Sequence, residues 1–131
     1  MAVAIVRLGT PRHPGEGLRL GTVRRPPRGV PKSDFAKRDF YDVWYPNLAP
    51  SVPAMKQAQL AQQAQDPRGW AAFVRKYRAE MATPDNARTL DLLAALSHQA
   101  NFAVGCYCQD EAHCHRSVLR ALLAERGAVI A

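Results

Sequence analysis

The apolar positions of this chain fall into two spacings, one typical of β-strands and one typical of α-helices. Short apolar, β-branched or aromatic runs predict strands over residues 3–7, 18–23, 41–45, 101–108 and 128–130. The run Phe102–Cys108 is apolar almost throughout, as expected of a strand that is covered on both faces. We therefore expect this strand to be central in its sheet, with helices packed on both sides.

Apolar residues at helical spacing predict four helices. Each of the first three begins with a capping residue that is followed within two positions by proline, and the predicted N-caps are Ser51, Asp66 and Thr83. These helices are expected to end near residues 64, 81 and 99. The fourth is predicted over residues 117–126, and Gly127 follows it as a C-terminal glycine.

The order of these elements predicts the fold class. The chain ends as strand, helix, strand, which implies a parallel pair of strands joined by a right-handed crossover. Five of the ten prolines precede residue 32 and none follows Pro84, so the first part of the chain is expected to be rich in loops. We predict a single three-layer α/β domain over residues 1–131, Rossmann-like, with a short, mostly parallel sheet flanked by helices.

The charge of the chain is concentrated near its N-terminus. The formal net charge is +7, and residues 1–40 hold nine basic and three acidic side chains, a net +6. A localised cationic segment favours anionic partners, which here means a phosphate-bearing small molecule or a nucleic acid, although such runs are often simply solvated surface. No apolar stretch is long enough to cross a bilayer. We therefore expect no membrane association and a cytoplasmic location, with reduced thiols.

All three cysteines fall within nine residues, in the run Cys106-Tyr107-Cys108-Gln109-Asp110-Glu111-Ala112-His113-Cys114-His115-Arg116. Cys106 and Cys108 are expected on one side of a strand, and Cys114, His115 and Arg116 at the start of the next helix. A helix N-terminus binds anions and lowers the pKa of a thiol. We expect an anion pocket here, with Arg116 holding the anion and Cys114 or His115 as the catalytic groups. Cys114 is expected to be the most reactive thiol.

Two other interpretations of the cysteine run stay open. Cys106 or Cys108 could bind a metal together with Cys114 and either His113 or His115, but the spacing Cys-x-Cys-x5-Cys-His does not match the paired spacings of structural zinc modules. We therefore assign no metal ligand from the sequence. Alternatively, the cysteines are small apolar residues that pack the helix against the sheet.

A second candidate site is the loop that contains Arg24, Arg25 and Arg28, which follows a predicted strand and is stiffened by Pro26 and Pro27. Stiffening lowers the entropy cost of holding guanidinium groups around a polyanion, and arginine binds phosphate in a bidentate manner. Pairing with Asp34, Asp39 or Glu16 is the alternative. Trp44 could stack on a base. Because parallel strands place their following loops at one edge, Arg24–Arg28 and Cys106–Arg116 are expected to converge.

Four separated motifs stand out along the chain, namely the runs Gly21–Val30 and Tyr41–Ser51, Cys106-Tyr107-Cys108 and Cys114-His115-Arg116. They resemble motifs of the bacterial domain-of-unknown-function family 488. A predicted helix with Trp70, Phe73, Tyr77 and Glu80 is also similar to the central helix of that family. The resemblance covers nearly the whole chain and implies a small α/β protein. The residues themselves favour a pocket for a phosphorylated or nucleotide-like small molecule. The alternative is a nucleic-acid-binding or regulatory module without catalysis, although no helix-turn-helix or ribonucleoprotein signature is present.

Overall fold

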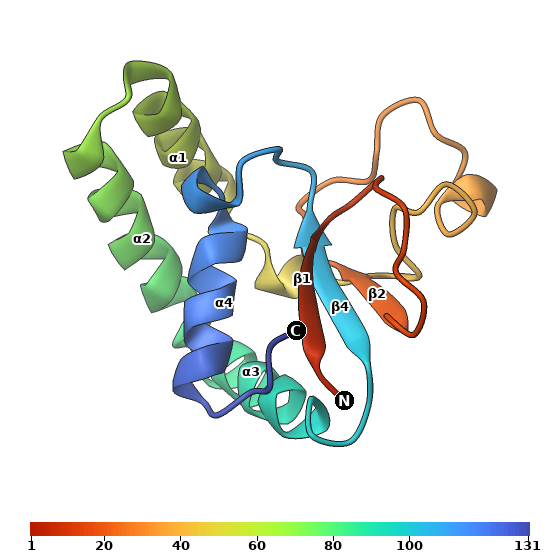
Figure 1. The fold of residues 1–131 in the computed structure, drawn as a ribbon. Coiled ribbons are helices and arrows are strands. Elements are labelled where there is room, and N and C mark those ends of the chain that lie inside the picture. Colours follow the sequence, from red (N-terminus) through yellow and green to blue (C-terminus); the bar gives the residue numbers. More distant parts are fainter.

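Four parallel strands form the sheet in the computed structural model, which describes residues 1–131. Their bounds are β1 Val3–Arg7, β2 Leu18–Gly21, β3 Val43–Trp44 and β4 Phe102–Cys106. The strand order is β1-β4-β2-β3, so β4 is central and all five of its residues are buried (Figure 1). The predicted α/β class, the parallel sheet and the central strand are confirmed.

The last predicted strand is reduced to a single bridge. Ile130 pairs with Val3 in parallel, and the N–H of Val3 donates to the carbonyl of Val129 at 2.9 Å. This parallel contact follows the helix after β4, so the predicted strand, helix, strand order is present.

The helices are α1 Val52–Ala64, α2 Pro67–Met81, α3 Pro84–Leu96 and α4 His115–Glu125. Ser51 and Asp66 cap α1 and α2 as predicted, because their side chains accept hydrogen bonds from the N–H groups of Ala54 and Arg68. Thr83 precedes α3 without a side-chain cap. The fourth helix begins two residues earlier than predicted, at His115, with Cys114 at its N-cap position.

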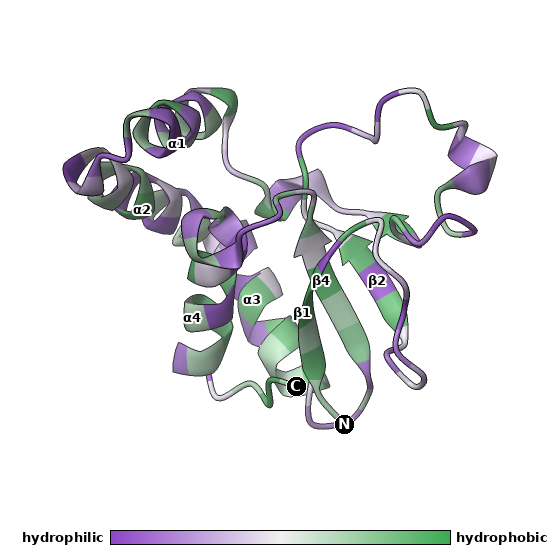
Figure 2. Ribbon diagram, turned by 45° about the horizontal axis from the view of Figure 1, so that its top comes forward, coloured by the Kyte–Doolittle hydropathy of each residue, from purple (hydrophilic) through white to green (hydrophobic).

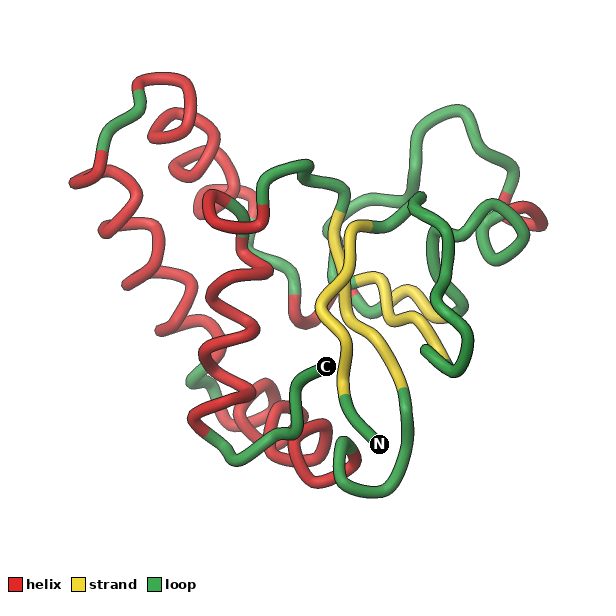
Figure 3. The backbone as a smooth tube through the Cα atoms, in the orientation of Figure 1, coloured by secondary structure: helices red, strands yellow, loops and turns green.

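Helices on both faces of the sheet were expected, and this expectation is wrong. All four helices pack against one face, where they share one apolar cluster with Val3, Phe102 and Val104. The other face is covered by the loops on either side of β2, residues 8–17 and 22–41, whose only helical element is the short 3-10 helix η1, Lys32–Asp34 (Figures 1 and 3). The sheet still lies between two layers. The second layer is formed by loops, because its prolines disfavour regular structure.

The direction of each crossover explains this division. The connection from β1 to β2 moves one way along the sheet, whereas the connections from β3 to β4 and from β4 to the terminal bridge move the other way. Right-handed crossovers in opposite directions lie on opposite faces of a sheet. The first connection therefore covers one face, and the helical connections cover the other.

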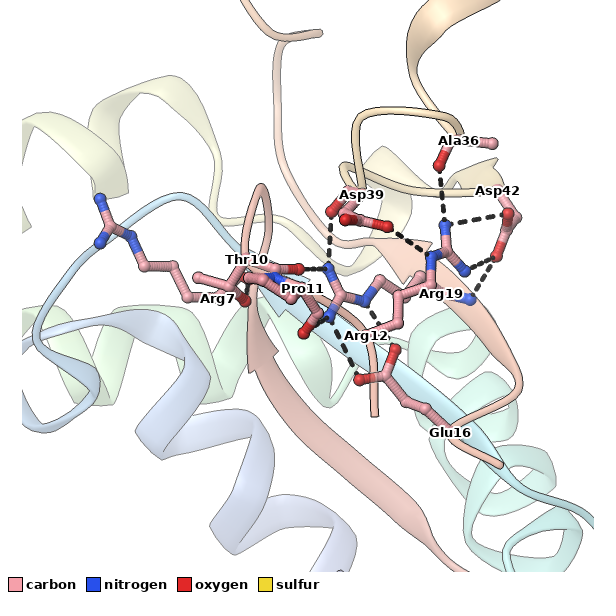
Figure 4. Close-up of polar contacts among 9 residues, drawn as sticks. All are labelled: Arg7, Thr10, Pro11, Arg12, Glu16, Arg19, Ala36, Asp39 and Asp42. Carbon is pink, nitrogen blue, oxygen red and sulfur yellow. Dashed lines mark hydrogen bonds and ion pairs between the residues drawn. The ribbon is translucent and has the colours of Figure 1, made fainter. Parts of the chain in front are cut away.

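A buried ion pair holds the loop layer in place (Figure 4). The strand β2 carries one hydrophilic band (Figure 2). Arg19 in this strand pairs its guanidinium with Glu16 at 2.7 Å, and both side chains are almost fully buried. Arg19 also donates to the carbonyls of Thr10 and Asp39 at 2.9 and 2.6 Å. Because these contacts satisfy the guanidinium, a charged side chain can occupy the interior and tie the loop segments to the sheet.

None of the helices combines the length and the apolar character that crossing a bilayer requires.

Candidate functional site

A cavity of about 1060 Å³ opens at the carboxyl end of β4, and both of the segments that the sequence singled out contribute to its wall. Arg24 to Arg28 form one side, and Cys106, Tyr107, Cys108 and His115 form another. The predicted convergence of these two segments, which lie about eighty residues apart, is therefore found in the structure. The remaining wall comes from Phe40 and from α1 with the residues before it, namely Pro50, Val52, Met55, Lys56 and Gln59.

The position of the cavity follows from the topology. After β4 the chain turns toward the helical face, whereas after the neighbouring strands β1 and β2 it turns toward the loop face. The backbone thus separates above β4, and α/β sheets bind ligands in such a crevice at the carboxyl ends of their strands. Gly21 and Gly105 pair side by side just below the crevice.

Arginine side chains give the cavity a cationic wall that no carboxylate neutralises. Neither Arg25 nor Arg28 forms a salt bridge, and Arg24 donates only to the carbonyls of Ala49 and Pro50. Of the three acids proposed as their partners, Glu16 pairs with Arg19 and Asp39 with Arg12, and Asp34 forms no salt bridge. Lys56 adds a fourth cation to the lining, and no aspartate or glutamate is part of it.

Two of the predicted ligand-binding residues lie outside this lining. Trp44 is exposed beside the loop, and its indole N–H donates to the carbonyl of Val23 at 2.8 Å. Arg116 is only 4% exposed and donates to the carbonyl of Cys108, while its Nε has no hydrogen-bond partner. Arg116 thus lies behind the cavity wall as a buried cation, and no salt bridge includes it.

The thiols and one imidazole gather where β4 ends and α4 begins. The Sγ atoms of Cys106 and Cys114 and a ring nitrogen of His115 all lie within 4.8 Å of one another, and the three residues are buried. β4 ends at Cys106 because its pairing with β1 ends there, at Arg7. Cys108 therefore lies beyond the strand rather than on the same sheet face as Cys106. It is half-buried and lines the cavity.

The hydrogen bonds of His115 define its tautomer. Nε2 lies 2.7 Å from the backbone carbonyl of Thr22, which can only accept, so Nε2 carries the proton. In the neutral ring Nδ1 is then the nitrogen without a proton, and it lies 3.8 Å from Sγ of Cys114. His113 is different, because it is exposed and pairs with Asp110 at 2.7 Å. Of the two histidines, only His115 faces the thiols.

The pKa values of Cys106 and Cys108 are shifted in opposite directions. Hydrogen bonds from Cys106 and from Cys114, with the nearby guanidinium of Arg116, hold the pKa of Cys108 well below its usual range. The same contacts raise the pKa of Cys106, since it donates to Cys108 and Cys114 and is shielded from solvent. The cluster therefore holds negative charge at the cavity-facing cysteine and protons at the buried one.

Sequence reasoning missed several parts of this site. Phe40, Lys56 and Gln59 line the cavity from a loop and from α1, and the carbonyl of Thr22 orients His115. Only Lys56 carried a usable signal, as a cation in the second turn of a predicted helix. The others became visible only when the loop layer and α1 were brought beside β4.

Iodoacetamide is expected to alkylate Cys108 before Cys106 and Cys114 in the reduced, chelator-treated protein. Cys106 is 1% exposed and Cys114 is 2% exposed, whereas Cys108 is half-buried and reachable through the cavity. A time course followed by peptide mass mapping measures the order, with the unfolded protein as the control for intrinsic reactivity. First labelling at Cys114, as the sequence led us to expect, would contradict the accessibility seen in the structure.

Comparison with known proteins places the chain in a family. Its residues 3–127 match the family model DUF488-N3a, described as "Active DUF488-N3 subclade". No curated protein and no solved structure is significantly similar to the chain. The matched region spans every strand and helix of the fold and both walls of the cavity. The motifs that resembled family 488 are thus part of a match over almost the entire sequence, and the chain belongs to the DUF488-N3a family.

Proposed function

We propose that the protein binds a phosphorylated or nucleotide-like small molecule in the cavity above β4. The observation that carries this proposal is the charge of the lining, which contains Arg24, Arg25, Arg28 and Lys56 and no carboxylate. Cations crowded together repel one another unless an anion lies between them. Pro26 and Pro27 lie between Arg25 and Arg28 and restrict the backbone of the loop before any ligand arrives, which favours affinity.

The shape of the cavity favours a small molecule over an extended nucleic acid. Its volume of about 1060 Å³ lies just above the range that is usual for small-molecule sites, about 300–1000 Å³. Phe40, Met55 and Tyr107 add apolar and aromatic surface beside the cations. An arrangement of this kind suits a ligand that carries both a phosphate and a flat or apolar part, as a nucleotide does.

The groups proposed to act on the ligand lie at the floor of the cavity. His115 lines it directly, and Cys114 lies behind His115 with its Sγ 3.8 Å from Nδ1. With Nε2 fixed on the carbonyl of Thr22, the unprotonated Nδ1 is available to accept a proton or to bind an electrophile. We therefore keep Cys114 and His115 as the proposed catalytic pair and Arg116 as the buried cation that supports negative charge beside them.

Isothermal titration with inorganic pyrophosphate and with ADP tests the proposal. The double variant Arg25→Gln/Arg28→Gln is expected to bind at least about tenfold more weakly than the unchanged protein, because each lost charge-assisted hydrogen bond is worth roughly 1.5–3 kcal/mol. Arg75→Gln is the matched control, since Arg75 is exposed on α2 and takes no part in the cavity. Equal affinity of all three proteins for both ligands would refute an anion site in this cavity.

The salt dependence of binding distinguishes the small molecule from a nucleic acid. Association with one phosphorylated molecule involves few phosphate contacts and should weaken only slightly as salt is raised. A single-stranded DNA oligonucleotide gives a steep slope if it follows the basic loop. Tight, steeply salt-dependent binding of the oligonucleotide, with no measurable binding of ADP, would favour the nucleic-acid module instead.

A further inference from the structure

The cluster at the floor of the cavity has the composition and spacing of a metal centre. We propose that Cys106, Cys114 and His115 bind a thiophilic divalent cation, with Zn²⁺ the best match, and that Cys108 supplies the fourth ligand from the cavity side. The first three ligand atoms all lie within 4.8 Å of one another. Tetrahedral zinc, with Zn–S of about 2.3 Å and Zn–N of about 2.0 Å, places neighbouring ligand atoms roughly 3.5–3.8 Å apart.

His115 is held as a metal-binding histidine is held. Its Nε2–H donates to the carbonyl of Thr22 at 2.7 Å, an outer partner of the kind that fixes the ring and tautomer of zinc ligands. Nδ1 therefore directs a lone pair at Cys114, 3.8 Å away. A hydrogen bond from the Cys114 thiol would use that lone pair weakly, because S–H is a poor donor. A cation bound between the two atoms would be a stronger partner for the Nδ1 lone pair.

Arg116 supplies an independent argument from charge. Its side chain is buried, its Nε has no partner, and it forms no salt bridge, so an unpaired positive charge lies behind the cluster. Burying such a charge is costly unless a nearby negative charge compensates it. A dication bound by three thiolates carries a net charge of −1, which one guanidinium neutralises. We assign the third thiolate to Cys108, which follows Cys106 by two residues and lines the cavity together with Cys106 and His115.

The tertiary structure, rather than the sequence spacing, assembles this donor set. Cys106 comes from the end of β4, Cys114 and His115 from the start of α4, and a 3-10 turn, η3 Glu111–His113, returns the chain between them. The resulting three-sulfur, one-nitrogen set suits zinc and excludes the hard cations Mg²⁺ and Ca²⁺, which prefer oxygen. Cys108 is the one half-buried member of the set and the other three are buried, so a ligand in the cavity would meet the metal at this corner.

Titration of the reduced, metal-free protein with Co²⁺ tests this inference without phosphate or substrate. One Co²⁺ per chain is expected, with the visible bands of tetrahedral cobalt, thiolate charge-transfer absorption and displacement by Zn²⁺. His115→Gln should lower the affinity by more than the roughly 10–100-fold that outer partners of a metal ligand contribute. His113→Gln is the matched control, because His113 lies only two residues away but is exposed to solvent and pairs with Asp110.

X-ray absorption at the zinc edge of the unchanged, zinc-loaded protein tests the proposal even if a variant fails to fold. Three sulfur neighbours and one nitrogen are expected. A spectrum of six oxygen or nitrogen neighbours, an octahedral Co²⁺ complex, or equal affinity of His113→Gln and His115→Gln would each overturn the proposal. This inference goes beyond the proposed anion binding and does not depend on it, since neither experiment contains an anion ligand. A bound metal would occupy Sγ of Cys114 and Nδ1 of His115, so it would replace their proposed role as a catalytic pair.

Discussion

Replacing Glu16 with alanine is expected to destabilise the fold by about 3–5 kcal/mol, the cost of breaking a buried ion pair by removing one partner. Arg19, which would remain, is 1% exposed and could not reach water without distorting β2. The hydrogen bonds from Arg19 to the carbonyls of Thr10 and Asp39 would persist, but neutral carbonyls do not neutralise the positive charge. Chemical denaturation at neutral pH, followed by circular dichroism, measures the change in the free energy of unfolding.

Glu125→Ala is the matched control for this loss. Glu125 also pairs with an arginine, Arg78, at 3.0 Å, but both side chains are substantially exposed. A solvated pair of this kind contributes only about 0–1 kcal/mol. If Glu16→Ala and Glu125→Ala changed the free energy of unfolding equally, the loop layer could not depend on the buried pair.

Replacing Gly17 with alanine is expected to destabilise the fold by about 2–5 kcal/mol, through backbone strain of roughly 1–2 kcal/mol and an overpacking cost of roughly 1–3 kcal/mol. Gly17 has a φ of +85°, and a Cβ there would lie 2.0 Å from the carbonyl oxygen of Asn101. That oxygen belongs to the backbone just before β4, so it cannot move without shifting β4 against β2. Denaturant unfolding of the variant measures the loss.

Gly15→Ala separates strain from crowding. Gly15 has nearly the same backbone conformation, with φ of +78°, but nothing lies within 4 Å of a Cβ placed there. Its expected cost is therefore the strain alone, about 1–2 kcal/mol. Equal losses for Gly15→Ala and Gly17→Ala would mean that the approach of residue 17 to β4 does not restrict the sheet.

Local signals in the sequence predicted the helices well. Serine and aspartate caps followed by proline located the starts of α1 and α2 to within a residue, because capping and the fixed φ of proline act within one turn. The start of α4 was placed two residues late, since Cys114 is not a usual N-cap. The end of α3 was placed three residues late, at Gln99 instead of Leu96.

Strand ends depended on partners that the sequence does not display. β2 was expected to reach residue 23 and stops at Gly21, and β4 was expected to reach Cys108 and stops at Cys106. A strand continues only while a neighbour pairs with it. Where β1 ends, the chain after Cys106 leaves the sheet, and this departure brings Cys108 to the cavity.

By itself, the sequence determined the α/β class, the helix starts, the central apolar strand and the convergence of the Arg24–Arg28 loop with the cysteine run. These follow from short-range rules and from the fact that parallel strands place their loops at one edge. Only the tertiary structure decided which acids are already paired, which cysteine faces solvent and which histidine faces the thiols. Those properties depend on burial and on contacts between distant segments, such as His115 with Thr22, and no spacing along the chain encodes them.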